Sequence, residues 1–202
     1  MRLGSRFLLA LTIWGATLPP ATAQSVFRFT AIPDQNTARL QERFGGVAAY
    51  LSEELGVQVD YIPVKSYAAS VAAFKNSEVQ LAWFGGLSGV QARLAVPGSK
   101  AIAQGEEDLA FVSYFIAHHS TGLTTSDAFP AQIAGRTFTF GSKGSTSGRL
   151  MPEYYVRQHL GKAPNEVFDR VGFSGDHSKT LALVQSGAYQ VGALNYKVWD
   201  NE

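Results

Sequence analysis

Apolar residues recur along this chain with two different periods, one typical of strands and the other of helices. Phe27, Phe29 and Ala31 alternate with polar positions, which predicts a strand. From about Thr37 the apolar residues fall on one helical stripe, and Gly56 follows where a helix C-cap belongs. The stripe consists of Leu40, Phe44, Val47, Ala48, Leu51 and Leu55.

The same alternation continues to the end of the chain. We expect further strands at 57–61, 79–83, 137–140, 171–173 and 191–194, and helices at 67–75, 147–159 and 178–185. Strands that alternate with helices form right-handed crossover units around a largely parallel sheet. The pattern therefore predicts an α/β protein.

An apolar strand at 112–117 and a polar run at 118–127 mark the seam between two halves. We expect a first α/β lobe at 24–116 and a second, incomplete one at 117–202. The segments 73–85 and 183–195 match in register, as a helix end, a polar turn and a strand. Either a duplication or the general form of such units explains the match. Under duplication, Gly85 and Asn195 both lie just beyond strand ends, where open α/β sheets bind ligands.

Residues 1–23 have the layout of a secretory signal peptide. Arg2 and Arg6 precede an apolar run at 7–18, and residues 21–23 (Ala-Thr-Ala) fit a cleavage site. The run is short for an ordinary membrane span, with an N-terminal anchor helix as the alternative. We therefore expect an exported, periplasmic protein.

The composition limits the chemistry that this chain can perform. It has 202 residues, of which 46% are hydrophobic and 16% charged, and a formal net charge of +1. This balance is globular and gives no basic face for nucleic acid, so any anion must be held by local donors. The absence of cysteine excludes thiolate metal sites, cysteine nucleophiles and a lipid anchor on cysteine.

Three consecutive hydroxyl residues, Ser145, Thr146 and Ser147, lie in a glycine-rich turn between a predicted strand and a predicted helix. We call them the hydroxyl turn. Hydroxyls, free backbone N–H groups and the helix dipole together favour an anion at such a place. Serine and threonine also cap helices, but three in a row exceed what capping requires. Lys143 does not follow the final glycine of a Walker A pattern, which excludes that kind of phosphate loop.

Three more side chains are candidate ligand contacts. His177 lies in a second strand-to-helix turn. It could donate to an oxyanion, or it could be an exposed side chain with no role in binding. Tyr67, at a helix start, could supply a phenol donor or pack in the core. Trp83 precedes glycines where a backbone can approach a ligand closely, and could form cleft wall or core.

The sequence gives little support for a metal site or for a hydrolase active site. His118 and His119 are adjacent, so on a strand they would face opposite ways. Ser145 and His177 could form a nucleophile and base, but there is no G-x-S-x-G elbow and no orienting carboxylate except Asp176. We expect a binding protein rather than an enzyme, with no metal and no cofactor.

Five motifs form a specific combination: 29–34 (FTAIPD), 64–69 (VKSYAA), 81–86 (LAWFGG), 144–148 (GSTSG) and 192–195 (GALN). Together they resemble the phosphonate/phosphite-binding periplasmic proteins of ABC importers, and most closely the selenate-binding branch. The resemblance spans the whole mature chain. It implies a type II periplasmic binding fold, in which two α/β lobes close around a ligand cleft.

The resemblance also implies roles for individual residues. The hydroxyl turn would hold the oxyanion, and Tyr67 and His177 would reach it as well. A further family aromatic corresponds to Phe111, which lacks the hydroxyl. Family members continue past Asn201 with a return crossover and acidic ligand contacts, so we expect a C-terminally truncated chain.

The function implied is that of the substrate-binding component of an ABC importer, which delivers a small tetrahedral oxyanion to an inner-membrane permease. A periplasmic sensing module that reports to a membrane receptor kinase would have the same fold and site, and stays as the alternative. Phosphonate, phosphite and phosphate can carry a proton at neutral pH and benefit from a carboxylate, whereas selenate and sulfate cannot. Among the motifs expected to line the cleft, Asp176 supplies the one carboxylate, which favours a proton-free dianion unless the missing C-terminal part provides another.

Overall fold

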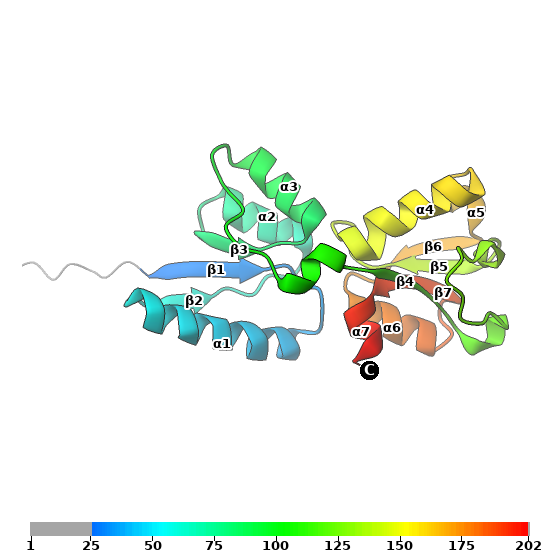
Figure 1. Ribbon diagram of the computed structural model, residues 1–202, viewed down its shortest axis with the longest axis horizontal. Helices are drawn as coiled ribbons and strands as arrows, with labels where there is room; N and C mark the ends of the chain where they lie inside the picture. The colour runs from blue at the N-terminus through cyan, green and yellow to red at the C-terminus, as the bar shows by residue number, and fades with distance from the viewer. Residues whose placement is uncertain (1–25, 202) are drawn as a thin grey trace, which may run out of the picture.

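The computed structural model describes residues 26–201 as two lobes, each built on its own β-sheet (Figure 1). Helices cover both faces of each sheet, so each lobe has three layers. This confirms the expected α/β class. The predicted signal peptide and its cleavage site lie outside the described residues. Within residues 26–201, no helix is both long and apolar enough to cross a membrane.

The first lobe is a parallel sheet with strand order β2-β1-β3. Its elements are β1 (Phe27–Ala31), α1 (Thr37–Leu55), β2 (Val59–Tyr61), α2 (Tyr67–Lys75), β3 (Leu81–Trp83) and α3 (Gly86–Ala95). The sequence predicted all of these except α3. Helix α3 was not predicted because two of its ten residues are glycines, which have low helix propensity.

Local capping explains where α1 begins and ends. The Asn36 side chain accepts from the Arg39 N–H at 3.0 Å, and Gly56 adopts the left-handed conformation with φ 63°. Leu40 and Phe44 are buried, and the Phe44 ring packs on the first sheet. The outer part of the predicted stripe stays uncovered, with Val47 and Leu55 exposed.

The second lobe has strand order β4-β7-β5-β6, with β4 antiparallel to β7. Its elements are β4 (Ser113–Ala117), β5 (Thr137–Phe140), α4 (Met151–Leu160), α5 (Pro164–Val167), β6 (Arg170–Phe173), α6 (His177–Gln185), β7 (Val191–Asn195) and α7 (Tyr196–Asp200). The boundary expected between residues 116 and 117 falls inside β4. Because β4 belongs to the second sheet, the division lies before Ser113.

Both lobes share one topology. In the first, β1-α1-β2-α2-β3 gives the order β2-β1-β3; in the second, β5-α4-β6-α6-β7 gives the order β6-β5-β7. Gly85 is the N-cap of α3, and Asn195 is the N-cap of α7. The two residues that the internal match paired therefore occupy equivalent places.

The crossover between the lobes is fastened to α7. It includes a short 3₁₀ helix at Glu106–Ala110, which lies between the lobes in Figure 1. The Lys197 ammonium pairs with Glu107 at 2.6 Å, and the Phe111 ring packs edge-on against Tyr196 at 5.4 Å. These contacts join the crossover to the second lobe.

The core of the second lobe is built on Phe138, which is fully buried. Its ring stacks on Phe168 with centroids 4.4 Å apart and meets Phe140 edge-on at 4.7 Å. Ring pairs at such separations add to the free energy of burial. Phe138 lies on β5, the strand that leads into the hydroxyl turn, so the core fixes the base of that turn.

We expect Phe138→Ala to lower the free energy of unfolding by about 3–5 kcal/mol, because it leaves a cavity among these rings. Urea unfolding followed by circular dichroism measures the change. Tyr50→Ala is the matched control, since Tyr50 is 61% exposed, and a surface substitution changes stability by about 0.5 kcal/mol or less. Equal effects of the two substitutions would contradict the assigned core.

Candidate functional site

The two lobes meet where loops follow the ends of strands. The His177 N–H donates to the carbonyl of Asp34 at 2.9 Å, and the Leu87 N–H donates to Thr146 Oγ1 at 2.8 Å. Gly144 lies so close to Tyr67 that a Cβ there would fall 2.9 Å from the Tyr67 Cβ. The lobes are therefore closed on each other, with the hydroxyl turn at the contact.

The hydroxyl turn begins a helix that starts with one wide turn, Thr146–Leu150, and continues as α4. Ser145 is its N-cap and accepts the Gly148 N–H at 2.9 Å. The backbone N–H groups of Thr146 and Ser147 have no partner among the described residues. Ser147 is 8% exposed, and its hydroxyl likewise makes no hydrogen bond to another described residue. The turn thus presents unsatisfied donors.

His177 is the first residue of α6 and is 2% exposed. The Asn195 N–H donates to its Nδ1 at 3.2 Å, so Nε2 carries the proton of the neutral ring. That Nε2 lies 3.4 Å from Ser145 Oγ. Burial lowers the His177 pKa to about 4. At neutral pH the ring is therefore an uncharged donor directed at the hydroxyl turn.

Tyr67 contributes from the first lobe. It is buried at the start of α2, which Ser66 caps by accepting the Ala69 N–H at 3.1 Å. Burial raises the pKa of the Tyr67 phenol, the nearby Asp34 carboxyl raises it further, and contact with Ser145 opposes both effects. The phenol consequently keeps its proton and can donate beside the hydroxyl turn.

The structure thus brings together the hydroxyl turn, Tyr67 and His177, all predicted from the sequence. Asn195 joins them indirectly: its backbone fixes the His177 ring, while its side chain accepts the Val198 N–H at 2.9 Å and caps α7. Trp83 ends β3 and is 48% exposed. Among the described residues, no hydrogen bond or ring contact joins Trp83 to the cluster, so its role as a ligand contact stays a prediction.

Asp34 was missed by the sequence analysis. It lies just beyond the end of β1 and joins the cluster through its bond with His177. Burial is the main factor that raises the Asp34 pKa; Arg43 and a hydrogen bond to its own backbone lower it, and Asp176 raises it. The available signal was its position, because the carboxyl end of a central strand is where ligands of α/β sheets bind.

The geometry argues against the hydrolase alternative. Ser145 and His177 are close, but a general base must accept the serine proton at Nε2. Here the backbone N–H of Asn195 occupies Nδ1 as a donor, so Nε2 is itself protonated. In catalytic triads a carboxylate accepts from Nδ1 instead. Among residues 26–201, no group of three or more potential ligands could hold a metal ion.

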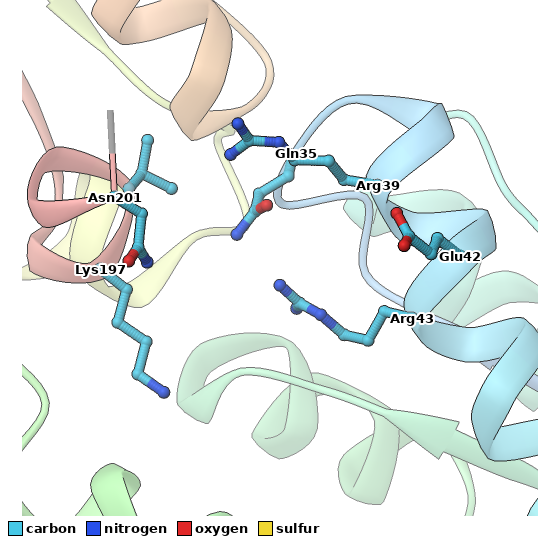
Figure 2. A pocket seen from close by; sticks show the side chains of 7 residues that line it. Gln35, Arg39, Glu42, Arg43, Lys197 and Asn201 are labelled. Carbon is cyan, nitrogen blue, oxygen red and sulfur yellow. The ribbon is translucent and has the colours of Figure 1, made fainter.

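Two cavities flank the cluster, each lined by both lobes. One, of about 430 Å³, is lined by Tyr67 and Gln91 of the first lobe and by Lys143 and Phe173 of the second, among others. The other, of about 500 Å³, we call the basic opening. It is lined by Gln35, Arg39, Glu42, Arg43, Lys197, Val198 and Asn201 (Figure 2).

The lowered pKa of His177 makes stability depend on pH. Between pH 6.5 and about 4 the unfolded chain binds a proton at this residue that the folded protein does not, so its contribution to stability falls as the pH is lowered. As the pH falls across that window, the free energy of unfolding of the unmutated protein should drop by about 3 kcal/mol more than that of His177→Gln. Urea unfolding at several pH values measures the difference, with His119→Gln as the exposed control. Identical pH dependence of the variant and the unmutated protein would show that His177 titrates normally.

Comparisons with known proteins point in one direction. A family model described as "ABC transporter, phosphonate, periplasmic substrate-binding protein" matches residues 29–202. An ABC transporter phosphite binding protein, PhnD1 of Prochlorococcus marinus (strain MIT 9301), is 44% identical over 185 residues, which cover 91% of this chain and 62% of that protein. The phosphonates-binding periplasmic protein of Escherichia coli (strain K12) is 26% identical over 82% of this chain and 50% of its own length.

Solved structures agree. PhnD1 of Prochlorococcus marinus in complex with methylphosphonate superposes with a TM-score of 0.82 at 45% identity, over 87% of this chain and 65% of that one. A binding protein of a phosphonate ABC transporter from Pseudomonas aeruginosa shares the fold, with a TM-score of 0.71 at 21% identity over 88% of this chain and 59% of that one. The chain spans less than two thirds of the length of these relatives. With its two α/β lobes and its interlobe cluster of donors, the chain belongs to the family of periplasmic substrate-binding proteins of phosphonate ABC transporters.

Proposed function

We propose that this chain captures a small tetrahedral oxyanion, a phosphonate or phosphite, in the cleft between its lobes, and that it serves an ABC importer as the substrate-binding component. In this role it works in the periplasm and delivers the ligand to an inner-membrane permease. The observation that carries the proposal is the convergence of uncharged donors from both lobes on the hydroxyl turn.

The donors suit an oxyanion in number and kind. The turn offers two unpartnered backbone N–H groups and the Ser147 hydroxyl, at a helix start where the dipole adds partial positive charge. The Tyr67 phenol and the His177 Nε2–H add donors from two other helix starts. Hydrogen bonds to a charged acceptor are about twice as strong as neutral ones. A buried anion held by several of them is stable without a cationic partner.

Closure follows from the same geometry. Tyr67 belongs to the first lobe and the hydroxyl turn to the second, so an anion that contacts both favours the closed arrangement over an open one. The interlobe bonds of His177 and Thr146 add to this preference. A carrier needs this behaviour, because a permease can then distinguish the loaded form from the empty one.

The named relatives support the choice of ligand class. A relative 44% identical to this chain is described as binding phosphite, and the solved structure of PhnD1 contains methylphosphonate. Selenate, periplasmic export through a cleaved signal peptide and the permease partner remain predictions from the sequence.

Calorimetric titration of the full-length protein tests the proposal. We expect saturable binding of methylphosphonate and phosphite with no turnover of either. Ser147→Ala should weaken binding by roughly 10- to 150-fold, because a hydrogen bond to a charged group contributes about 1.5–3 kcal/mol. This variant is cleaner than Ser145→Ala, since the Ser145 hydroxyl also caps a helix.

Ser186→Ala is the matched control. Its hydroxyl donates to the Leu183 carbonyl at the far end of α6, away from the cleft, so the affinity should not change. Unchanged affinity in Ser147→Ala would reject the assigned site. Absence of binding in the unmutated protein, or hydrolysis of the ligand, would reject the function.

A further inference from the structure

Asp34 introduces a carboxyl group into a cluster that otherwise consists of uncharged hydrogen-bond donors. Its carbonyl accepts the His177 N–H at 2.9 Å, and its own N–H donates to the Ile32 carbonyl at 2.9 Å. These two bonds fix the backbone of Asp34 at the interlobe contact. The imidazole of the same His177 faces the hydroxyl turn. The backbone of Asp34 is therefore bonded to the residue whose imidazole faces the hydroxyl turn.

The charged and titratable groups around Asp34 come from three elements and one turn. Arg43 on α1 is the nearby cation, and Asp176 in the turn before α6 is the nearby anion. Tyr61 on β2 and Tyr67 on α2 are close enough for the Asp34 charge to raise both phenol pKa values. Figure 2 shows the Arg43 side chain extending from α1 into the basic opening. The carboxyl is thus within electrostatic reach of Tyr67, which in turn contacts Ser145.

Asp176 is less suited to meet a ligand. One of its oxygens accepts the Lys179 N–H at 2.7 Å as the N-cap of α6. The Asp34 carboxyl interacts with the backbone of its own residue, which lowers its pKa. Among the described residues it makes no hydrogen bond to another side chain, so no donor from another residue competes with a ligand for it.

A carboxylate beside an oxyanion repels it unless a proton lies between them. Phosphonate and phosphite can hold that proton at neutral pH, so a single proton is shared between a ligand oxygen and an Asp34 oxygen, and no covalent bond changes. Sulfate and selenate oxygens are too weakly basic to do so. For those anions the proton would have to be supplied entirely by protonating the carboxyl, which costs free energy at neutral pH.

We propose that Asp34 selects the ligand class by sharing one proton with the bound oxyanion, so that phosphonates and phosphite bind while sulfate and selenate are rejected. The inference rests on the proposed function, because it places the oxyanion on the hydroxyl turn. It reverses the preference for a proton-free dianion that the sequence favoured when Asp176 was the one carboxylate considered.

The test compares Asp34→Asn with Glu42→Gln by calorimetry using methylphosphonate, sulfate and selenate. Glu42 is an exposed carboxylate that lines the basic opening, so its variant removes the same charge nearby without touching the cluster. In the unmutated protein and Glu42→Gln, methylphosphonate should bind about 100-fold or more tighter than sulfate. In Asp34→Asn, methylphosphonate should bind about 10- to 100-fold more weakly, and sulfate and selenate equally or more tightly.

Proton linkage provides a readout that a structural role would not change. Above the pH at which free methylphosphonate loses its last proton, binding to the unmutated protein should take up one proton, so affinity falls about tenfold per pH unit. Asp34→Asn should lose that dependence, and Asp34→Glu, which keeps the carboxyl, should retain it. Titration in two buffers of different ionisation enthalpy measures the uptake directly.

The outcomes separate the two proposals. If the unmutated protein binds methylphosphonate but Asp34→Asn keeps both the selectivity and the proton uptake, the role of Asp34 is wrong and the proposed function stands. If the unmutated protein binds no phosphonate or phosphite, both are wrong. Unfolding midpoints of the three variants within a few degrees of the parent confirm that selectivity is compared between folded proteins.

Discussion

Backbone N–H groups at the start of a helix have no partner inside that helix, and the arrangement of this protein follows from where it places them. The second lobe begins two helices at the interlobe contact, one after β5 and one after β6. The first contributes the hydroxyl turn, and the second contributes His177. Each lobe alone leaves these donors facing the cleft, and the contact between the lobes encloses them.

The donors are uncharged, and under the proposed function this determines how the cleft discriminates between anions. His177 stays neutral because it is buried and because Asn195 donates to its Nδ1. Tyr67 stays protonated for the same reason of burial. With no full positive charge inside the cluster, we expect the single carboxyl at Asp34 to have a large effect on which anion the proposed site accepts. The cations of the basic opening lie at the edge of the cleft rather than among the donors.

The sequence predicts the parts of this structure that depend on local periodicity and capping. The strands before and after each crossover, the α1 boundaries and the helix start at the hydroxyl turn all follow from neighbouring residues. The lobe boundary does not, because β4 pairs with β7, which lies far along the chain. Helix α3 was missed because its glycines have low helix propensity, and α7 was missed because it is only five residues long.

The candidate site divides in the same way. Ser145, Thr146, Ser147, Tyr67 and His177 were found because each lies at a helix start that a local pattern reveals. Asp34 was missed because its meaning depends on closure, which brings its carbonyl to the N–H of His177. Trp83 was included because it precedes glycines, but sequence position cannot show that its side chain is half exposed at the end of β3.

A crystal structure of this protein with methylphosphonate tests the central claim most directly. The account predicts the phosphonate oxygens at the start of α4, within hydrogen-bond distance of the Thr146 and Ser147 N–H groups, the Tyr67 hydroxyl and the His177 Nε2. A ligand bound in the basic opening instead, with the hydroxyl turn covered by other side chains, would contradict it.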